Sequence, residues 1–211
     1  MPAHEQSVAD EFNRYLGEHA ARFGMMFKPF ALSGQDRDAA ADYLVTTASR
    51  FSLIEFKYRT SNIRDESAKW RRRKLCVSLE KNSIMRRLHD MCHYLVWLDT
   101  RNLQPQTNVY RHEVCNQSIF GVASGLKAIA PTDRLRMTAE EFSADFFNSN
   151  SPHGLSLADF EKYLVWLMVV TSGGPNSTLE LMCRDEGSSI FSYKVFSSVR
   201  EASNWLYSSK T

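Results

Sequence analysis

The segment from Phe51 to Tyr58 reads Phe-Ser-Leu-Ile-Glu-Phe-Lys-Tyr and constrains the fold more than any other part of the sequence. Alternate residues of a strand point to opposite faces, so Phe51 and Leu53 share one face while Ile54 and Phe56 share the other. A strand that is apolar on both faces belongs in the middle of a sheet with a layer on each side. The sequence therefore predicts an α/β fold with a mixed sheet around this strand.

Length and composition fit one globular domain. The chain has 211 residues, 43% hydrophobic and 24% charged, which argues against a disordered chain, a disulfide miniprotein or a repeat array. No linker or repeat divides it, so we expect a single domain over 1–211, with a core in 1–100 and an elaboration of unknown role in 101–211. The longest apolar run, Tyr163 to Val170, is far below the roughly 20 residues that cross a bilayer. The start of the chain does not resemble a signal peptide, so a soluble, cytoplasmic protein without membrane contact is expected.

Hydrophobic spacing predicts the order of elements in the first hundred residues. A helix is expected over about 8–23, begun by a capping box of Ser7 and Asp10 and ended by Gly24. The elements expected after it are a weak strand at 25–30, a hairpin at 42–58, a helix at about 80–91 and a buried strand at 93–98.

The second half of the sequence predicts further helices and a hairpin. Thr138 with Glu141, and Ser156 with Asp159, have capping-box spacing and open apolar helical patterns. The elements expected here are helices at 138–147 and 156–170, a hairpin of strands 179–184 and 190–196, and a short helix near 199–207.

The first hairpin places three charged side chains on one face of the sheet. If Ser49 and Arg50 form a two-residue loop, Asp42 lies opposite Lys57, and Glu55 lies two residues away on the same face. A three-residue loop would turn Asp42 to the other face, so the prediction depends on the length of the loop.

The chemistry of these groups suits a metal-assisted reaction on phosphate. Carboxylates of Asp42 and Glu55, with the backbone carbonyl of Phe56, offer the hard oxygen ligands that Mg²⁺ or Mn²⁺ prefers. Lys57 beside such an ion can position or deprotonate a water, or neutralise charge that grows on a phosphate under attack. Hydrolysis of phosphodiester bonds is the predicted reaction.

At these residues the sequence resembles the PD-(D/E)xK nuclease superfamily, whose motif is an acid at the start of one strand and Glu-x-Lys on the next. The match is Asp42 followed by Glu55-Phe56-Lys57, although Ala41 stands where the signature proline would be. The αβββαβ core of that family, the restriction-endonuclease-like fold, also matches the predicted order of elements over the first hundred residues.

The resemblance implies a Mg²⁺-dependent DNA endonuclease acting as a homodimer or as a subunit of a larger complex. Restriction, antiviral defence and DNA repair are the settings it implies, without a choice among them. Some members of the family add a glutamate from the first helix to the metal site, and Glu11 is the nearest candidate in this sequence.

A basic segment follows the motif directly. Between Arg59 and Lys74 seven basic residues stand against two acidic ones, whereas the whole chain carries a formal charge of only +2. Such a segment can neutralise backbone phosphates, with an indole available to stack on a base. The candidate nucleic-acid contacts are Arg59, Arg64, Lys69, Trp70, Arg71, Arg72, Arg73 and Lys74.

The charged motif and the basic segment each have a simpler, non-functional interpretation. Glu55 and Lys57 are also consistent with a surface ion pair, worth under about 1 kcal/mol, and the basic segment with a solvated loop. The rival function is a catalytically inactive nucleic-acid-binding or assembly subunit on the same fold, and the substrate of an active enzyme could be RNA.

The cysteines carry a weaker signal. Cys76, Cys92, Cys115 and Cys183 lack paired spacing, so reduced thiols and no structural disulfide are expected. His89-x-x-Cys92 and His112-x-x-Cys115 offer ligands compatible with structural zinc, but a cysteine on an apolar helix face is more often a small core residue. His93 and His112 are expected to be packing or surface residues.

Overall fold

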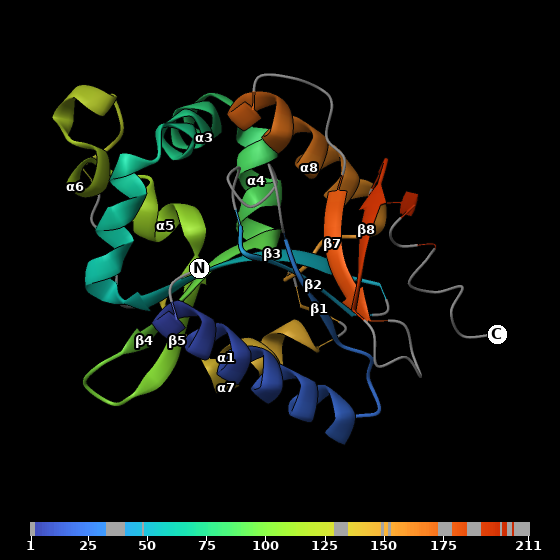
Figure 1. Ribbon diagram of the computed structural model, residues 1–211. Coiled ribbons are helices and arrows are strands. Elements are labelled where there is room, and N and C mark those ends of the chain that lie inside the picture. Colours follow the sequence, from blue (N-terminus) through green and yellow to red (C-terminus); the bar gives the residue numbers. More distant parts are fainter. Residues whose placement is uncertain are drawn as a thin grey trace.

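The computed structural model describes residues 3–32, 41–47, 49–128, 135–148, 150, 151, 153–172, 179–184, 191–198, 200, 201 and 204. A six-stranded mixed sheet forms its centre, with helices on both faces (Figure 1). The strands follow each other across the sheet in the order β1 (Lys28–Ala31), β2 (Tyr43–Thr46), β3 (Phe51–Arg59), β4 (His93–Asp99), β5 (Gln104–Val109) and β6 (Met137–Thr138). β4 runs parallel to β3, and the other neighbouring pairs are antiparallel. The central position predicted for β3 is confirmed.

Each face of the sheet has its own apolar core, because successive residues of β3 alternate between the faces. Ile54 and Phe56 pack with α1 (Ala3–Arg22) and α7 (Ala139–Phe146). Phe51 and Leu53 pack on the other side, which α3 (Trp70–Lys81), α4 (Ser83–Cys92) and α8 (Leu157–Ser172) cover. The remaining elements are η1 (Thr60–Ala68), α5 (Tyr110–Val114), α6 (Gln117–Phe120), η2 (Val122–Ser124) and a separate hairpin of β7 (Leu179–Arg184) and β8 (Phe191–Phe196).

The first helix begins earlier than predicted. α1 starts at Ala3, and Ser7 lies inside it, where its hydroxyl donates to the carbonyl of Ala3 at 3.1 Å. The predicted capping box of Ser7 is therefore wrong. Gly24 has a φ of 64°, a left-handed conformation that glycine adopts at little cost, and ends the helix as predicted.

The basic segment from Arg59 to Lys74, for which the sequence predicts no helix, is mostly helical. Residues 60–68 form the 3₁₀ helix η1, and α3 begins at Trp70. The apolar residues Leu75, Cys76 and Leu79 belong to this helix and are buried at helical spacing. Two consecutive helices therefore stand where one was predicted.

The predictions for the second half of the chain agree more closely with the structure. Thr138 and Glu141 form the expected capping box at the start of α7, and the Ser156 hydroxyl accepts from the backbone N–H of Asp159 before α8. The predicted hairpin is also present, as β7 and β8. The predicted last helix near 199–207 falls mostly outside the described residues. Within the described part, no helix is long and apolar enough to span a membrane.

Candidate active site

The hairpin of β2 and β3 has a different register from the predicted one. Thr46 pairs with Phe51, and Leu44 pairs with Leu53, so the connection is four residues long rather than two. Threonine hydroxyls stabilise the longer loop: that of Thr46 donates toward the carbonyl of Arg50 at 2.8 Å, and that of Thr47 accepts from the Arg50 N–H at 3.2 Å. The shift is two residues, so it preserves which side chains share a face.

Asp42, Glu55 and Lys57 therefore meet as the sequence predicts, though with different pairing. Extending the register by one residue places Asp42 opposite Glu55 rather than Lys57. The Asp42 carboxylate accepts a hydrogen bond from the backbone N–H of Phe56 at 2.8 Å. The Lys57 ammonium lies 2.7 Å from Oε1 of Glu55 and 3.1 Å from the carbonyl oxygen of Phe56. All three side chains are buried, so a simple surface ion pair is excluded.

A third buried carboxylate, which the sequence analysis does not predict, completes the site. Glu66, in η1, is fully buried and lies 3.1 Å from the Lys57 ammonium. Arg72 bridges the two acids at 3.0 Å from Glu55 and 3.1 Å from Glu66, and Lys69 bridges them at 3.1 and 2.6 Å. We call Glu55, Lys57, Glu66, Lys69 and Arg72 the charge cluster. The sequence signal for Glu66 is an acidic residue inside a strongly basic segment.

Mutual attraction fixes the charges of Glu55 and Lys57. Burial alone would raise the pKa of Glu55, but the positive charges of Lys57, Arg72 and Lys69 outweigh it and hold that pKa well below its usual range. Burial would lower the pKa of Lys57, but Glu55 and Glu66 outweigh it and raise that pKa. Lys57 is therefore an ammonium ion in the folded protein.

Asp42 responds differently because it is buried beside a second carboxylate. Burial, and then the negative charge of Glu55, raise the pKa of Asp42 to about 7. The folded protein therefore holds a proton at Asp42 more tightly than the unfolded chain does. Protonated Asp42 therefore stabilises the folded state, and this stabilisation is complete below a pH of about 4 and is lost as the pH rises through 7.

Replacing Asp42 by Asn is accordingly expected to stabilise the metal-free protein at pH 8. An amide keeps an acceptor for the Phe56 N–H but carries no charge. Because the pKa of Asp42 rises from 3.8 to about 7 on folding, the gain in the free energy of unfolding is at most about 4 kcal/mol. Urea unfolding in EDTA at pH 5 and pH 8 measures the effect, which should be larger at pH 8. Asp99→Asn is the control: Arg101 lowers the pKa of Asp99, so this variant should gain no stability. An equal effect of Asp42→Asn at both pH values would contradict the account.

The oxygens of the site fit a divalent cation in chemical type. Oε1 of Glu55 and the carbonyl oxygen of Phe56 already converge on one cation, the Lys57 ammonium, and Asp42 adds a carboxylate beside them. Two carboxylates and a carbonyl suffice for Mg²⁺, which keeps several waters. Among the described residues, no three Asp, Glu, His or Cys side chains form a group that could hold a metal ion. The donors of the candidate site are therefore two carboxylates and one backbone carbonyl.

The first-helix acid near the site is Glu5 rather than Glu11. Glu11 pairs with Arg14 on the exposed side of α1, at 2.5 Å. Glu5 is half-buried, its pKa is raised by burial, and the charges of Lys57 and Glu55 also act on it. The predicted helix starts at about residue 8 and does not include Glu5, whereas α1 begins at Ala3 and does.

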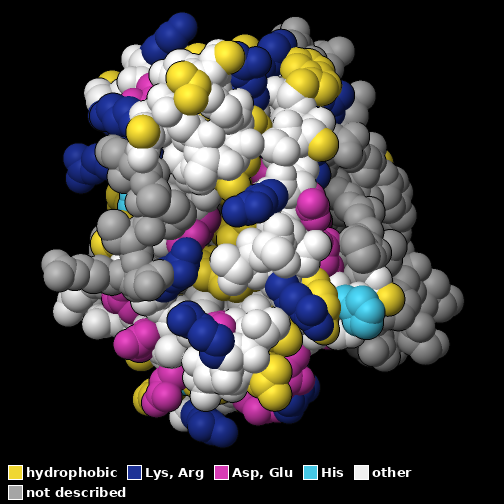
Figure 2. Space-filling model, turned by 90° about the vertical axis from the view of Figure 1, so that its left-hand side faces the viewer, with side chains coloured by type: hydrophobic (Ala, Val, Ile, Leu, Met, Phe, Trp, Pro, Cys, Tyr) yellow, Lys and Arg dark blue, Asp and Glu magenta, His cyan; other side chains and the backbone are white. Residues whose placement is uncertain are grey.

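The basic segment divides into inward and outward parts. Arg72 is buried, and Lys69 is partly exposed but directs its ammonium to the buried carboxylates. Trp70 is 57% exposed, with the Lys74 ammonium 4.4 Å from its ring centre. The other exposed residues of the prediction are Arg59, Arg64, Arg73 and Lys74, and Arg71 is half-buried. On the face that includes α6, Lys and Arg side chains are spread out, with acidic side chains among them (Figure 2).

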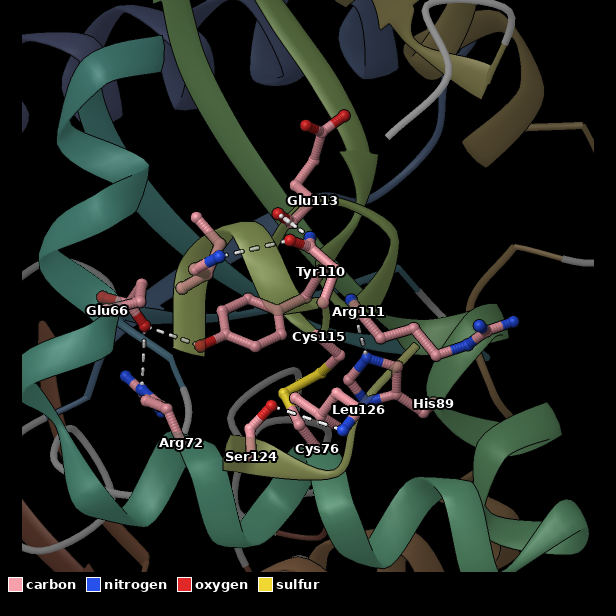
Figure 3. The surroundings of a disulfide bond; sticks show 12 residues. Glu66, Arg72, Cys76, His89, Tyr110, Arg111, Glu113, Cys115, Ser124 and Leu126 are labelled. Carbon is pink, nitrogen blue, oxygen red and sulfur yellow. Dashed lines mark hydrogen bonds and ion pairs between the residues drawn. A yellow bond between two sulfur atoms is a disulfide. The ribbon is translucent and has the colours of Figure 1, made fainter. Parts of the chain in front are cut away.

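The expectation of no structural disulfide is wrong. Cys76 of α3 and Cys115, just after α5, form a disulfide with their Cα atoms 5.1 Å apart (Figure 3). They are 39 residues apart in the sequence, and only the packing of α5 against the rest of the fold brings them together. The prediction of reduced thiols therefore fails for this pair.

The same disulfide removes one ligand from the zinc alternative. Cys115 is bonded to Cys76, and His89 is already engaged, since its Nε2 accepts from the Arg111 N–H at 3.2 Å and its Nδ1 lies 2.6 Å from the Tyr163 hydroxyl. His93 is buried against the same hydroxyl at 2.8 Å, which confirms that it packs in the core.

Comparison with known proteins adds no family to this geometry. No protein-family model, curated protein or solved structure matches the chain.

Proposed function

We propose that the protein is a metal-dependent nuclease that hydrolyses phosphodiester bonds, with DNA as the preferred substrate. In this proposal Asp42, Glu55 and the Phe56 carbonyl hold Mg²⁺ or Mn²⁺, and Lys57 is the cationic catalytic residue. The core order of α1, three strands, helices and a parallel fourth strand supports a restriction-endonuclease-like fold. The protein would work as a homodimer or within a larger complex.

One observation carries the proposal: Lys57 places its ammonium between two of the three proposed ligand oxygens. A buried acid and lysine fixed side by side on a central strand are costly to desolvate unless they pair closely or serve chemistry. Asp42, whose pKa is raised to about 7 beside Glu55, adds a group that a cation would favour in its ionised form.

The chemistry then divides among these residues. A bound divalent cation supplies Lewis-acid polarisation of the phosphate and a water of lowered pKa. Lys57, held as an ammonium ion, stabilises the negative charge that grows on the phosphate oxygens during attack. Exposed cations of the basic segment hold the neighbouring backbone phosphates, and Trp70 offers a surface for stacking.

Cleavage of supercoiled plasmid DNA in the presence of Mg²⁺ tests this function. Glu55→Gln and Lys57→Met should each lower the rate by about 100-fold or more, because each removes a group from the reacting centre. Glu80→Gln is the matched control, since Glu80 is a partly exposed acid with ion-pair contacts no closer than 3.7 Å to Arg86 and Lys127. Equal cleavage by the wild-type protein and by Glu55→Gln, both shown to be folded by circular dichroism, would overturn the site.

A specific observation also favours the rival function. Both oxygens of Glu55 are engaged by cations of the protein itself, at 2.7 Å to Lys57 and 3.0 Å to Arg72. An inactive nucleic-acid-binding subunit would show salt-sensitive DNA binding without turnover. Its binding would weaken when Arg71, Arg73 and Lys74 become Ala, while Glu55→Gln would leave the binding unchanged.

A further inference from the structure

Lys69 differs from the other two cations of the charge cluster in its access to solvent. Lys57 is 4% exposed and Arg72 is 1% exposed, whereas the Lys69 side chain is 42% exposed. Lys69 is the residue that precedes α3, and it reaches the two carboxylates from the edge of the cluster. Of these three cations, Lys69 alone has a side chain that is substantially exposed to solvent.

The Lys69 ammonium contacts the same oxygens as the catalytic lysine. It lies 3.1 Å from Oε1 of Glu55 and 2.6 Å from Oε1 of Glu66, while Lys57 lies 2.7 and 3.1 Å from those two atoms. Two ammonium groups therefore bridge one pair of carboxylate oxygens. A divalent cation that approaches Glu55 meets an oxygen already shared by two positive charges.

We propose that Lys69 is a displaceable internal counter-ion that closes the metal site until nucleic acid draws it out. This inference rests on the proposed function. With Lys69 in place, two ammonium groups share Oε1 of Glu55, and the added positive charge repels a divalent ion; without it, only Lys57 contacts that oxygen. Removing one competing ammonium from Glu55 therefore strengthens metal binding.

The position of Lys69 links its release to the substrate. The next residue is the exposed Trp70, and Arg73 and Lys74 lie exposed in the first turns of α3. Backbone phosphates at this surface attract the Lys69 ammonium outward, because its side chain is long and partly exposed to solvent. Metal and nucleic acid then bind cooperatively, each favouring the state in which Lys69 has left Glu55.

Titration calorimetry with Mn²⁺ at pH 8 tests the inference on the full chain. Lys69→Met should bind Mn²⁺ about tenfold more tightly than the wild-type protein, and Lys69→Gln should behave in the same way. Lys69 makes no side-chain capping bond to α3, so its replacement removes no helix cap. Lys81→Met, which removes an exposed cation from the last turn of α3, should bind Mn²⁺ like the wild-type protein.

A phosphorothioate DNA duplex, whose linkages resist cleavage, supplies the second measurement. The duplex should tighten Mn²⁺ binding to the wild-type protein and have little effect on Lys69→Met. Equal Mn²⁺ affinity of wild-type and Lys69→Met, with binding still lost in Glu55→Gln, would overturn the role of Lys69 and leave the metal site standing. Failure of both proteins to bind Mn²⁺, or binding that Glu55→Gln leaves unchanged, would overturn the proposed function together with it.

Discussion

Reduction of the disulfide between Cys76 and Cys115 is expected to lower the free energy of unfolding by about 4 kcal/mol. The cross-link joins residues 39 apart, and a loop of this length removes roughly that much chain entropy from the unfolded state. It also ties α3, which carries Arg72, to α5, whose Tyr110 hydroxyl donates to Glu66 at 2.6 Å (Figure 3). Urea unfolding with and without dithiothreitol measures the loss.

Two variants separate the cross-link from other effects of the reductant. A protein with both Cys76→Ala and Cys115→Ala should have low stability and no response to dithiothreitol. Cys92→Ala removes a buried free thiol and should keep the full response. An unfolding midpoint of the wild-type protein that does not move with reductant would contradict the prediction, as would two free thiols at these positions in the oxidised protein.

Arg72→Met is expected to destabilise the protein by about 3–5 kcal/mol. The guanidinium is buried and bridges Glu55 and Glu66 at 3.0 and 3.1 Å, so its loss leaves two buried carboxylates with less compensation. Methionine fills much of the same volume, which limits the contribution of an empty cavity. Thermal unfolding at pH 7 gives the difference.

Arg73→Met is the matched control in the neighbouring position. Arg73 is exposed and donates to the carbonyl of Ala123 at 2.9 Å, so its replacement should change stability by about 1 kcal/mol or less. Equal unfolding temperatures of Arg72→Met and Arg73→Met would show that the buried ion pairs of Arg72 do not stabilise the fold by the expected amount.

The site could be predicted from sequence where strand alternation decided the outcome. Glu55 and Lys57 share a face because they are two residues apart on one strand, and this holds whatever the loop does. Asp42 reached the same face although the loop length was wrong, because the register shifted by two residues rather than by one. The apolar pattern of β3 likewise placed it correctly in the middle of the sheet.

Features set by long-range packing could not be predicted in this way. Glu66 faces Lys57 because η1 folds back over the sheet, and the sequence around it reads as a solvated basic stretch. The pairing of Cys76 with Cys115 depends on where α5 packs. Arg72 and Arg73 are adjacent residues of one basic run, yet helix geometry turns the first toward the acids and leaves the second exposed.

Binding of Mn²⁺ decides whether the carboxylates of Asp42 and Glu55 form a metal site. The wild-type protein, titrated at pH 8 and pH 6, should bind Mn²⁺ at a site that Glu55→Gln and Asp42→Asn each weaken by about tenfold or more. Binding should be tighter at pH 8, because the pKa of Asp42 is raised to about 7 and the carboxyl must lose its proton to become a good ligand. Mn²⁺ binding that both variants leave unchanged, or no binding by the wild-type protein at either pH, would contradict a metal-dependent site at Asp42 and Glu55.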